Sequence, residues 1–410
     1  MIDRFFDFSK TIDRMRQGPL GEHVDAFAAM LLKQGFPRST GRFQIRVVAD
    51  FSRWLARRRI PVANINASVV ERYGADYQRK FAFWSHRPPV LDRFLGMLNQ
   101  MGVTPIPEPI AIPHQAEIEA FRQYLRQERG LSERTIPNVV YWAGCFMSEQ
   151  VSKGCPDFSQ LGPRDVTHFV QRQAARVKSG TAKIMVAAMR TFLRYLRHRD
   201  QIQTDLAACI PAVSPYSVSA LPTYLPAGAV EKILAHCDRS TPVGKRNYAV
   251  LLLLARLGLR SGEIVGMNLE DIDWALGEIT IHGKGGRSSK LPLTSDVGQA
   301  LAEYLRHGRP TCSSRRVFLR RAAPITGLSL YGSIRNIVRA ALLRAGVDFP
   351  RKGSHIFRHT LATDMLRKGA SLDEIGEVLR HRSPKVTSVY AKVDLGALQK
   401  LAMAWPGGSR

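Results

Sequence analysis

Two clusters of proline divide this chain into three segments. The first cluster lies within residues 105–113 and the second within residues 211–226. Proline disfavours helix at its own position and at the residue before it, so both clusters predict extended linkers. A chain of 410 residues is long enough for two or three domains. We therefore expect three domains, at residues 1–110, 111–215 and 221–410.

The first two segments resemble each other weakly. Residues 24–27 are similar to residues 118–121, and the pair at 94–95 matches the pair at 192–193. Self-similarity at a fixed period, here about 95 residues, is typical of a repeated module. Apolar residues recur at helical spacing in both copies, so each predicts a small all-helical bundle, with the first a possible duplicate of the second.

The last helix of the second copy is expected at residues 181–199. Its apolar stripe consists of Met185, Met189, Phe192 and Leu196. Such a stripe at helical spacing predicts core packing. The basic residues largely off this stripe are candidates for contact with DNA phosphates: Lys183, Arg190, Arg194 and Arg197.

The third segment has a mainly helical pattern with one β-hairpin. An apolar helix at residues 248–257 should end at Gly258, since glycine favours the turn after a helix. Residues 278–281 and 290–293 predict two strands around a glycine-rich turn. Ser371 and Glu374 have the spacing of a capping box, which predicts a helix to about Arg380. Ser383-Pro384 should then start a short helix that carries Tyr390.

The charge of the chain predicts a polyanionic partner. Lys and Arg total 60 against 34 Asp and Glu, a formal net charge of +26, and the basic residues occur in every segment. This distribution favours nucleic acid over an anionic membrane surface. The longest apolar run is too short to span a bilayer, and the charged start is unlike a leader peptide. The five cysteines lack zinc-site spacing, so we expect reduced thiols, a cytoplasmic protein and no metal.

Four patches of the third segment contain the groups that metal-free phosphoryl transfer needs. Such a reaction requires a nucleophile, arginines that stabilise phosphoryl oxygens, and a general acid. The patches are, in order, Arg260 beside a glycine, Lys284 between glycines, His355 with Arg358, and His381 followed nine residues later by Tyr390. Taken singly, these residues are typical of helix caps, turns and cores, and Lys290 is a rival to Lys284. Together, in one segment, they predict an active site.

In this order the patches resemble the phage-integrase family of tyrosine site-specific recombinases. The resemblance covers about residues 221–393, and residues 112–212 are similar to the family's core-binding domain. It implies a mainly α fold with a small β-sheet in the catalytic domain, and helical domains that complete a C-shaped DNA clamp. It also implies an enzyme that requires no cofactor.

The resemblance implies a role for each patch. Tyr390 would attack the scissile phosphate and form a 3′-phosphotyrosine, while Arg260 and Arg358 clamp that phosphate. Lys284 is similar to the family's lysine that protonates the leaving 5′ oxygen. A second strand's 5′ hydroxyl then reverses the step, so no ATP is needed.

The histidines and two further residues receive roles in the same way. His355 would assist proton transfer at the tyrosine, and His381 would donate a hydrogen bond to a phosphoryl oxygen. Glu263 and His359 match supporting positions that orient Arg260 and the helix. Arg287, in the hairpin turn, is a further candidate for DNA contact.

This sequence departs from the family at one position. The family commonly has glycine before the histidine that corresponds to His381, where this chain has Arg380, a departure that would alter the geometry of the helix end and could add a phosphate contact. Beyond Tyr390, an apolar stripe could pack in its own domain or dock on a neighbouring protomer: Leu395, Leu398, Leu401 and Trp405.

The expected protein is a recombinase of a mobile element. Its partner would be double-stranded DNA with specific recombination sites, bound by a homo-tetramer with or without partner recombinases. We expect it to act in the cytoplasm, associated with the nucleoid. Two alternatives remain, a type IB topoisomerase-like enzyme and a non-catalytic DNA-binding regulator.

Overall fold

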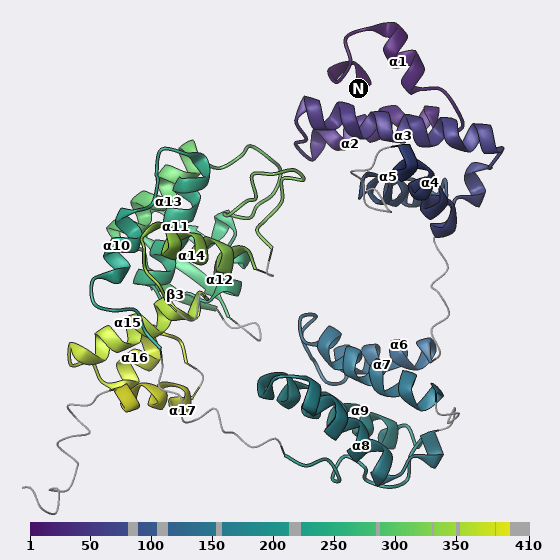
Figure 1. Cartoon of the computed structure of the whole chain (residues 1–410). Coiled ribbons are helices and arrows are strands. Elements are labelled where there is room, and N and C mark those ends of the chain that lie inside the picture. The colour runs from purple at the N-terminus through teal and green to yellow at the C-terminus, as the bar shows by residue number, and fades with distance from the viewer. Residues whose placement is uncertain are drawn as a thin grey trace, which may run out of the picture. The chain divides into compact units, whose positions relative to one another are not determined.

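The structure is a computed structural model of the chain (Figure 1). It describes residues 1–80, 89–104, 114–152, 158–212, 223–283, 288–329, 332–349, 353–381 and 383–393. The chain forms two compact units, Glu108–Ala220 and a unit that joins Met1–Pro107 with Leu221–Arg410. The division into three domains stays a prediction.

The N-terminal part is a helical bundle. Its helices are α1 (Ser9–Met15), α2 (Val24–Lys33), α3 (Arg38–Arg58), α4 (Ala67–Lys80) and α5 (Pro89–Gln100). Three short 3-10 helices connect them, η1 (Ile2–Arg4), η2 (Gly21–His23) and η3 (Val62–Asn64). Phe27, Phe51 and Phe94 are fully buried in one core, in which Phe27 and Phe94 meet edge to face. This bundle is built by aromatic packing along the apolar face of α3.

The second unit has the same kind of architecture. It consists of α6 (Gln115–Gln127), α7 (Ile136–Ser152), the 3-10 helix η4 (Phe158–Gln160), α8 (Pro163–Arg176) and α9 (Ser179–His198). The predicted last helix is confirmed as α9, and its apolar stripe is buried. Phe121 on α6 and Phe192 on α9 are buried like Phe27 and Phe94, their counterparts on α2 and α5. The sequence similarity therefore falls on helices in the same order.

The third segment is helical around a small sheet. Its helices are α10 (Ala229–Ala235), α11 (Pro242–Arg256), α12 (Ser261–Gly266), α13 (Ser295–His307), α14 (Ser333–Arg344), α15 (His355–Arg367), α16 (Leu372–Val378) and α17 (Pro384–Thr387), with 3-10 helices η6 (Leu269–Asp271) and η7 (Ser388–Val393). The antiparallel sheet has the order β1 (Ile272–Asp273), β2 (Glu278–His282), β3 (Ser288–Pro292). The predicted hairpin is confirmed, with Thr280 opposite Lys290.

Helix α11 forms the centre of the third segment's main core. Thr241 caps it by accepting a hydrogen bond from the Gly244 amide (3.0 Å), and Pro242 occupies the first turn, where no amide donor is needed. Residues 249–255 are all buried, with α13, α14 and α15 packed around them. The helix ends just before Gly258, whose φ is +56°. This turn places Arg260 at the start of α12.

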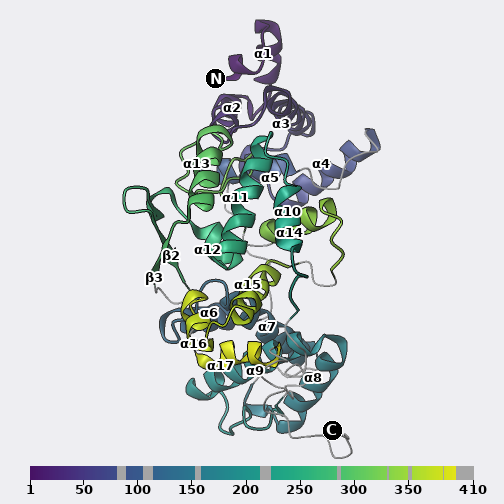
Figure 2. The same ribbon diagram turned by 90° about the vertical axis from the view of Figure 1, so that its left-hand side faces the viewer.

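A second, smaller core joins α15, α16 and η7. It consists of Ala362, Ile375, Leu379 and Tyr390, and the two views agree that α15, α16 and α17 lie side by side (Figures 1 and 2). The predicted capping box is confirmed, because Ser371 accepts from the Glu374 amide (3.2 Å) and Glu374 from the Ser371 amide (2.7 Å). The tyrosine at the end of the segment is therefore part of a packed cluster.

Two local predictions were wrong in detail. Helix α16 ends at Val378 and not at about Arg380, because Arg380 turns into a left-handed conformation (φ +53°). The His381 amide then bonds back to the Gly376 carbonyl (2.8 Å), which closes the helix end. Tyr390 lies in the 3-10 helix η7 and not in α17, and η7 packs against α15 and α16.

We predict that a side chain at Gly258 destabilises the fold more than one at another positive-φ glycine. A Cβ there would lie 2.8 Å from Leu379 and 3.0 Å from Leu361, in addition to the strain of a positive φ. Gly277 is the matched control, because it has a φ of +62° and open space around it. Gly277→Ala should cost about 1 kcal/mol of unfolding free energy, and Gly258→Ala about 1–3 kcal/mol more, measured by urea denaturation. Equal losses would contradict the close approach.

Candidate active site

Arg358 is a buried cation held by backbone carbonyls. It is 4% exposed, and its guanidinium donates to the carbonyls of Gly258 (2.6 Å) and Leu379. Within the described ranges no carboxylate forms an ion pair with it. Burial, with repulsion from Arg260 and Arg380, lowers its pKa to about 10, so it stays charged at neutral pH. A buried charge of this kind favours an anionic ligand, such as a phosphate.

Arg260 is fixed beside Arg358 by a carboxylate. Its backbone amide donates to Oε2 of Glu263 (2.8 Å) and its Nη1 to Oε1 (2.7 Å), while Nη2 donates to the Arg380 carbonyl (3.2 Å). The Glu263 side chain is 5% exposed and that of Arg260 37%. Arg260 is therefore held on its inner side and open on its outer side. The role of Glu263 in orienting Arg260 was expected from the resemblance.

The hydroxyl of Tyr390 lies close enough to this pair of arginines to be influenced by their charges. It is within 3.0 Å of Nδ1 of His359, the residue after Arg358 on α15, and Tyr390 is 2% exposed. Burial raises the pKa of the Tyr390 phenol, while the positive charges of Arg358 and Arg260 lower it. The phenol is thus protonated at rest, and attack on phosphorus requires a proton acceptor. His359, predicted only as a supporting residue, is the histidine in contact with it.

Two more histidines border the site in their neutral form. Nδ1 of His381 is 2.7 Å from the Thr387 hydroxyl, and its ring lies parallel to that of Tyr390. Burial, with Arg358 and Arg260, lowers the pKa of His381 to about 4. His355 is the first residue of α15 and is exposed, and its partial desolvation, with the same two arginines, lowers its pKa as well. Both rings can therefore exchange hydrogen bonds without adding charge.

The hairpin candidates are placed only in part. Lys284 and Arg287 lie outside the described residues. Lys290, the rival to Lys284, is on β3, where its ammonium forms an ion pair with Glu278 of β2 (2.8 Å). Lys290 is therefore engaged in a pairing across the sheet, and the choice of Lys284 as the general acid stays a prediction.

The four DNA-binding candidates on α9 have different surroundings. Arg190 donates to the Ile210 carbonyl (2.7 Å), and Arg197 is 3.4 Å from Asp205, so both contribute to their own domain. Arg194 is exposed and Lys183 half-buried. The outward-facing Arg194 is the best placed of the four for phosphate contact, which stays a prediction.

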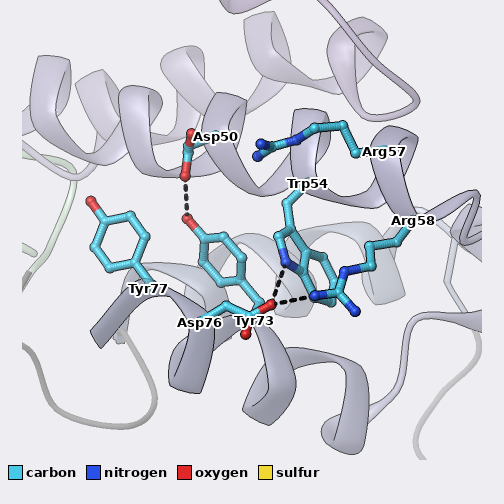
Figure 3. A pocket seen from close by; sticks show the side chains of 7 residues that line it. All are labelled: Asp50, Trp54, Arg57, Arg58, Tyr73, Asp76 and Tyr77. Atoms are coloured by element: carbon cyan, nitrogen blue, oxygen red, sulfur yellow. Dashed lines mark hydrogen bonds and ion pairs between the residues drawn. The ribbon is translucent and has the colours of Figure 1, made fainter. Parts of the chain in front are cut away.

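A pocket of about 390 Å³ lies elsewhere, between α3 and α4 (Figure 3). It is lined by Asp50, Trp54, Arg57, Arg58, Tyr73, Asp76 and Tyr77. Trp54 (3.0 Å) and Arg58 (2.8 Å) donate to Asp76, and the Tyr73 hydroxyl bonds to Asp50 (3.2 Å), as the dashed lines show. Because its polar groups pair with one another, this pocket is part of the bundle's own packing and not the candidate active site.

The described part of the chain offers neither a metal-binding cluster nor a membrane-spanning helix. No group of three or more His, Cys, Asp or Glu side chains within it could hold a metal ion. None of the helices described above is both long and apolar enough to cross a membrane.

A buried tyrosine beside two arginines, on a helical domain with a three-stranded sheet, defines the class of tyrosine recombinases. The model of the phage integrase family matches residues 223–395. A protein named as an integrase/recombinase, y4rA of Sinorhizobium fredii (strain NBRC 101917 / NGR234), is 41% identical over 408 residues, which are 98% of each chain. The chain therefore belongs to the phage integrase family, and it is an enzyme that cleaves and rejoins DNA.

Other relatives agree with this assignment. The tyrosine recombinase XerD of Listeria monocytogenes serotype 4b (strain F2365) is 31% identical over 284 residues, which are 67% of this chain and 93% of that protein. A crystal structure of the XerH site-specific recombinase, bound to palindromic difH substrate, has a TM-score of 0.57 at 19% identity, and covers 77% of this chain and 89% of that one. This likeness shows a common fold. The family, mainly helical fold and enzyme class predicted from the sequence are confirmed.

The site contains two residues outside the predicted catalytic and supporting set, Thr387 and Arg380, and for Arg380 the sequence suggested only a phosphate contact. Arg380 is buried, and its guanidinium lies 3.2 Å from Oε2 of Glu263. Thr387, on α17, holds the ring of His381. In the sequence, Arg380 stood out because the family commonly has glycine at its position. Nothing in the sequence pointed to Thr387, because its contact with His381 depends on how α17 packs against the end of α16.

We predict an acid-sensitive contribution of His381 to stability. Its pKa falls from 6.5 to about 4 on folding, so the unfolded chain binds a proton more readily between these values. The stabilisation is complete above about pH 6.5 and is lost as the pH falls towards 4. In thermal unfolding from pH 7 to 4.5, the wild type should lose more stability than His381→Asn. Parallel curves for the two proteins would refute the shifted pKa.

Proposed function

We propose that this protein is a site-specific recombinase that acts through a 3′-phosphotyrosine at Tyr390. The observation that carries the proposal is the contact between the Tyr390 hydroxyl and His359 (3.0 Å), one residue from the buried Arg358. The charges of Arg358 and Arg260 also act on the Tyr390 phenol, so a nucleophile, a proton acceptor and two phosphate-binding cations would share one site. General-base catalysis needs this hydrogen-bond distance between the base and the proton that it removes.

The first step would proceed as follows. The Tyr390 O–H bond breaks, and its proton passes to Nδ1 of His359. The phenolate oxygen forms a bond to phosphorus while the bond from phosphorus to the 5′ oxygen breaks. Lys284 would protonate that oxygen, as the resemblance implies. The phosphotyrosine retains the bond energy, so a second 5′ hydroxyl can reverse the step without ATP.

The remaining side chains would stabilise the phosphoryl oxygens. Arg260 and Arg358 would bind them as permanently charged donors, which suits a reaction that increases their negative charge. A Thr387 hydroxyl that donates to Nδ1 of His381 leaves the hydrogen on Nε2 of that ring, ready for a phosphoryl oxygen. His355 would bind at the exposed edge of the site and assist in proton transfer.

The partner we propose is double-stranded DNA with specific recombination sites. The relative y4rA is named an integrase/recombinase, and the solved XerH complex contains its difH substrate, which supports this choice. Recombination between two sites requires four strand cleavages, so we propose a homo-tetramer, with or without a partner recombinase. The element moved would be mobile, and the enzyme would act in the cytoplasm at the nucleoid.

The first test is covalent capture on DNA. A pool of nicked duplexes with random sequence is incubated with the protein, and adducts that survive detergent are selected. The wild type should form adducts at the 3′ side of the break, and Tyr390→Phe should form none while it binds DNA equally. A wild type that captures no duplex would refute the proposal. Strand exchange between two selected sites, without relaxation of supercoils, separates a recombinase from a topoisomerase-like enzyme.

The second test concerns His359. Loss of a general base typically slows a reaction about 10²- to 10⁴-fold, so His359→Ala should slow adduct formation within that range. The loss should shrink at alkaline pH, where the phenol deprotonates without help. Thr360→Ser, on the same helix, is a control that should leave the rate within about twofold. A His359→Ala variant as fast as wild type would assign the proton to another acceptor.

A further inference from the structure

Arg380 occupies a backbone position that favours glycine. Its φ is +53°, in the turn that ends α16, where the Arg380 amide bonds to the Glu377 carbonyl (2.9 Å). A side chain in this left-handed conformation is strained, and glycine is the usual residue there. A strained residue persists where its side chain contributes something that glycine lacks.

The Arg380 side chain points into the candidate active site. It is 11% exposed, and its Nη2 donates to Oε2 of Glu263 (3.2 Å). Its Nη1 donates to the Val378 carbonyl (3.1 Å) at the end of α16. In addition, its backbone carbonyl accepts the bond from Arg260 (3.2 Å). Arg380 thus touches both members of the Glu263–Arg260 pair.

Glu263 is shared between two arginines. One carboxylate oxygen accepts from Arg260 Nη1 (2.7 Å), and the other accepts from the Arg260 amide (2.8 Å) and from Arg380 (3.2 Å). If Arg260 alone faced this carboxylate, the two charges would largely cancel, and little positive potential would remain for a phosphate. The guanidinium of Arg380 also pairs with Glu263, so that the charge of Arg260 is no longer cancelled by this carboxylate.

We propose that Arg380 is a positioning residue of the cleavage reaction, which balances the charge of Glu263 so that Arg260 keeps its positive charge for the scissile phosphate. The proposal rests on the proposed function. Three guanidinium groups and one carboxylate give the site a net charge of +2, and glycine in place of Arg380 would leave +1. A phosphodiester carries one negative charge and its pentacovalent transition state two. The site therefore matches the transition state better than the ground state, which is the condition for a higher rate.

The test compares three substitutions at this position. Arg380→Gly removes the guanidinium and relieves the strain, so the fold should survive. Arg380→Lys and Arg380→Met are a matched pair, because both keep a long side chain in the strained conformation and only lysine is charged. The control is Arg59→Gly, since Arg59 ends α3 with the same φ of +53° but is exposed.

Each variant is assayed on duplexes that the wild type captures, in single turnover over a range of protein concentrations. Arg380→Gly and Arg380→Met should lower the maximal rate of adduct formation about 10- to 100-fold, with the half-saturating concentration unchanged. Arg380→Lys should recover to within about fivefold of wild type, and Arg59→Gly should stay within about twofold. Thermal unfolding of Arg380→Gly should begin no lower than that of Arg380→Met.

Three results would overturn the inference. They are a maximal rate for Arg380→Gly within about threefold of wild type, equal rates for the Lys and Met variants, and a loss confined to DNA affinity. The wild-type reaction in the same assay distinguishes a failure of the inference about Arg380 from a failure of the proposed function, because a wild type that forms no adducts would refute the proposed function itself. If the wild type forms adducts and Arg380→Gly matches it, only the role of Arg380 is refuted.

Discussion

The active site depends on how the guanidinium of Arg358 is held. This side chain extends from α15 and donates to two backbone carbonyls, that of Gly258 after α11 and that of Leu379 after α16. Three helix ends are thereby joined through one cation. Because the carbonyls are neutral, they position the charge without cancelling it, and a buried cation that meets no carboxylate among the described residues favours an anion. The glycine is essential to this arrangement, since a side chain at Gly258 would collide with Leu379.

The turn at residues 379–381, whose Leu379 carbonyl accepts from Arg358, also positions Arg260 and His381. The carbonyl of Leu379 accepts from Arg358 and that of Arg380 from Arg260, so consecutive peptide units hold the two arginines that would bind phosphate. His381 follows directly, and the arginines contribute to keeping its ring neutral. A single turn thus holds both arginines, and the neutral form of His381 follows from its burial together with their charges.

Much of the third segment could be predicted because its signals are local. The hairpin followed from strand patterns around glycines, and the start of α16 from the Ser371–Glu374 box. The apolar run before Gly258 predicted the C-terminal part of α11, but the helix begins at Pro242, six residues before the predicted start. The end of α16 could not be predicted, because a left-handed arginine contradicts the usual preference for glycine. The position of Tyr390 in the 3-10 helix η7 was not predicted either. No local motif marks this 3-10 helix, which packs against α15 and α16.

The sequence by itself determined the family and the mainly helical fold and predicted the residue types of the candidate active site, because periodicity, capping and motif order are properties of neighbouring residues. Tertiary structure alone decided which histidine meets the Tyr390 hydroxyl and that Glu263 serves two arginines at once. These contacts join residues that are 31 and 117 positions apart. Their geometry depends on how the helix ends at Gly258 and Leu379 pack together, and no local pattern encodes that packing.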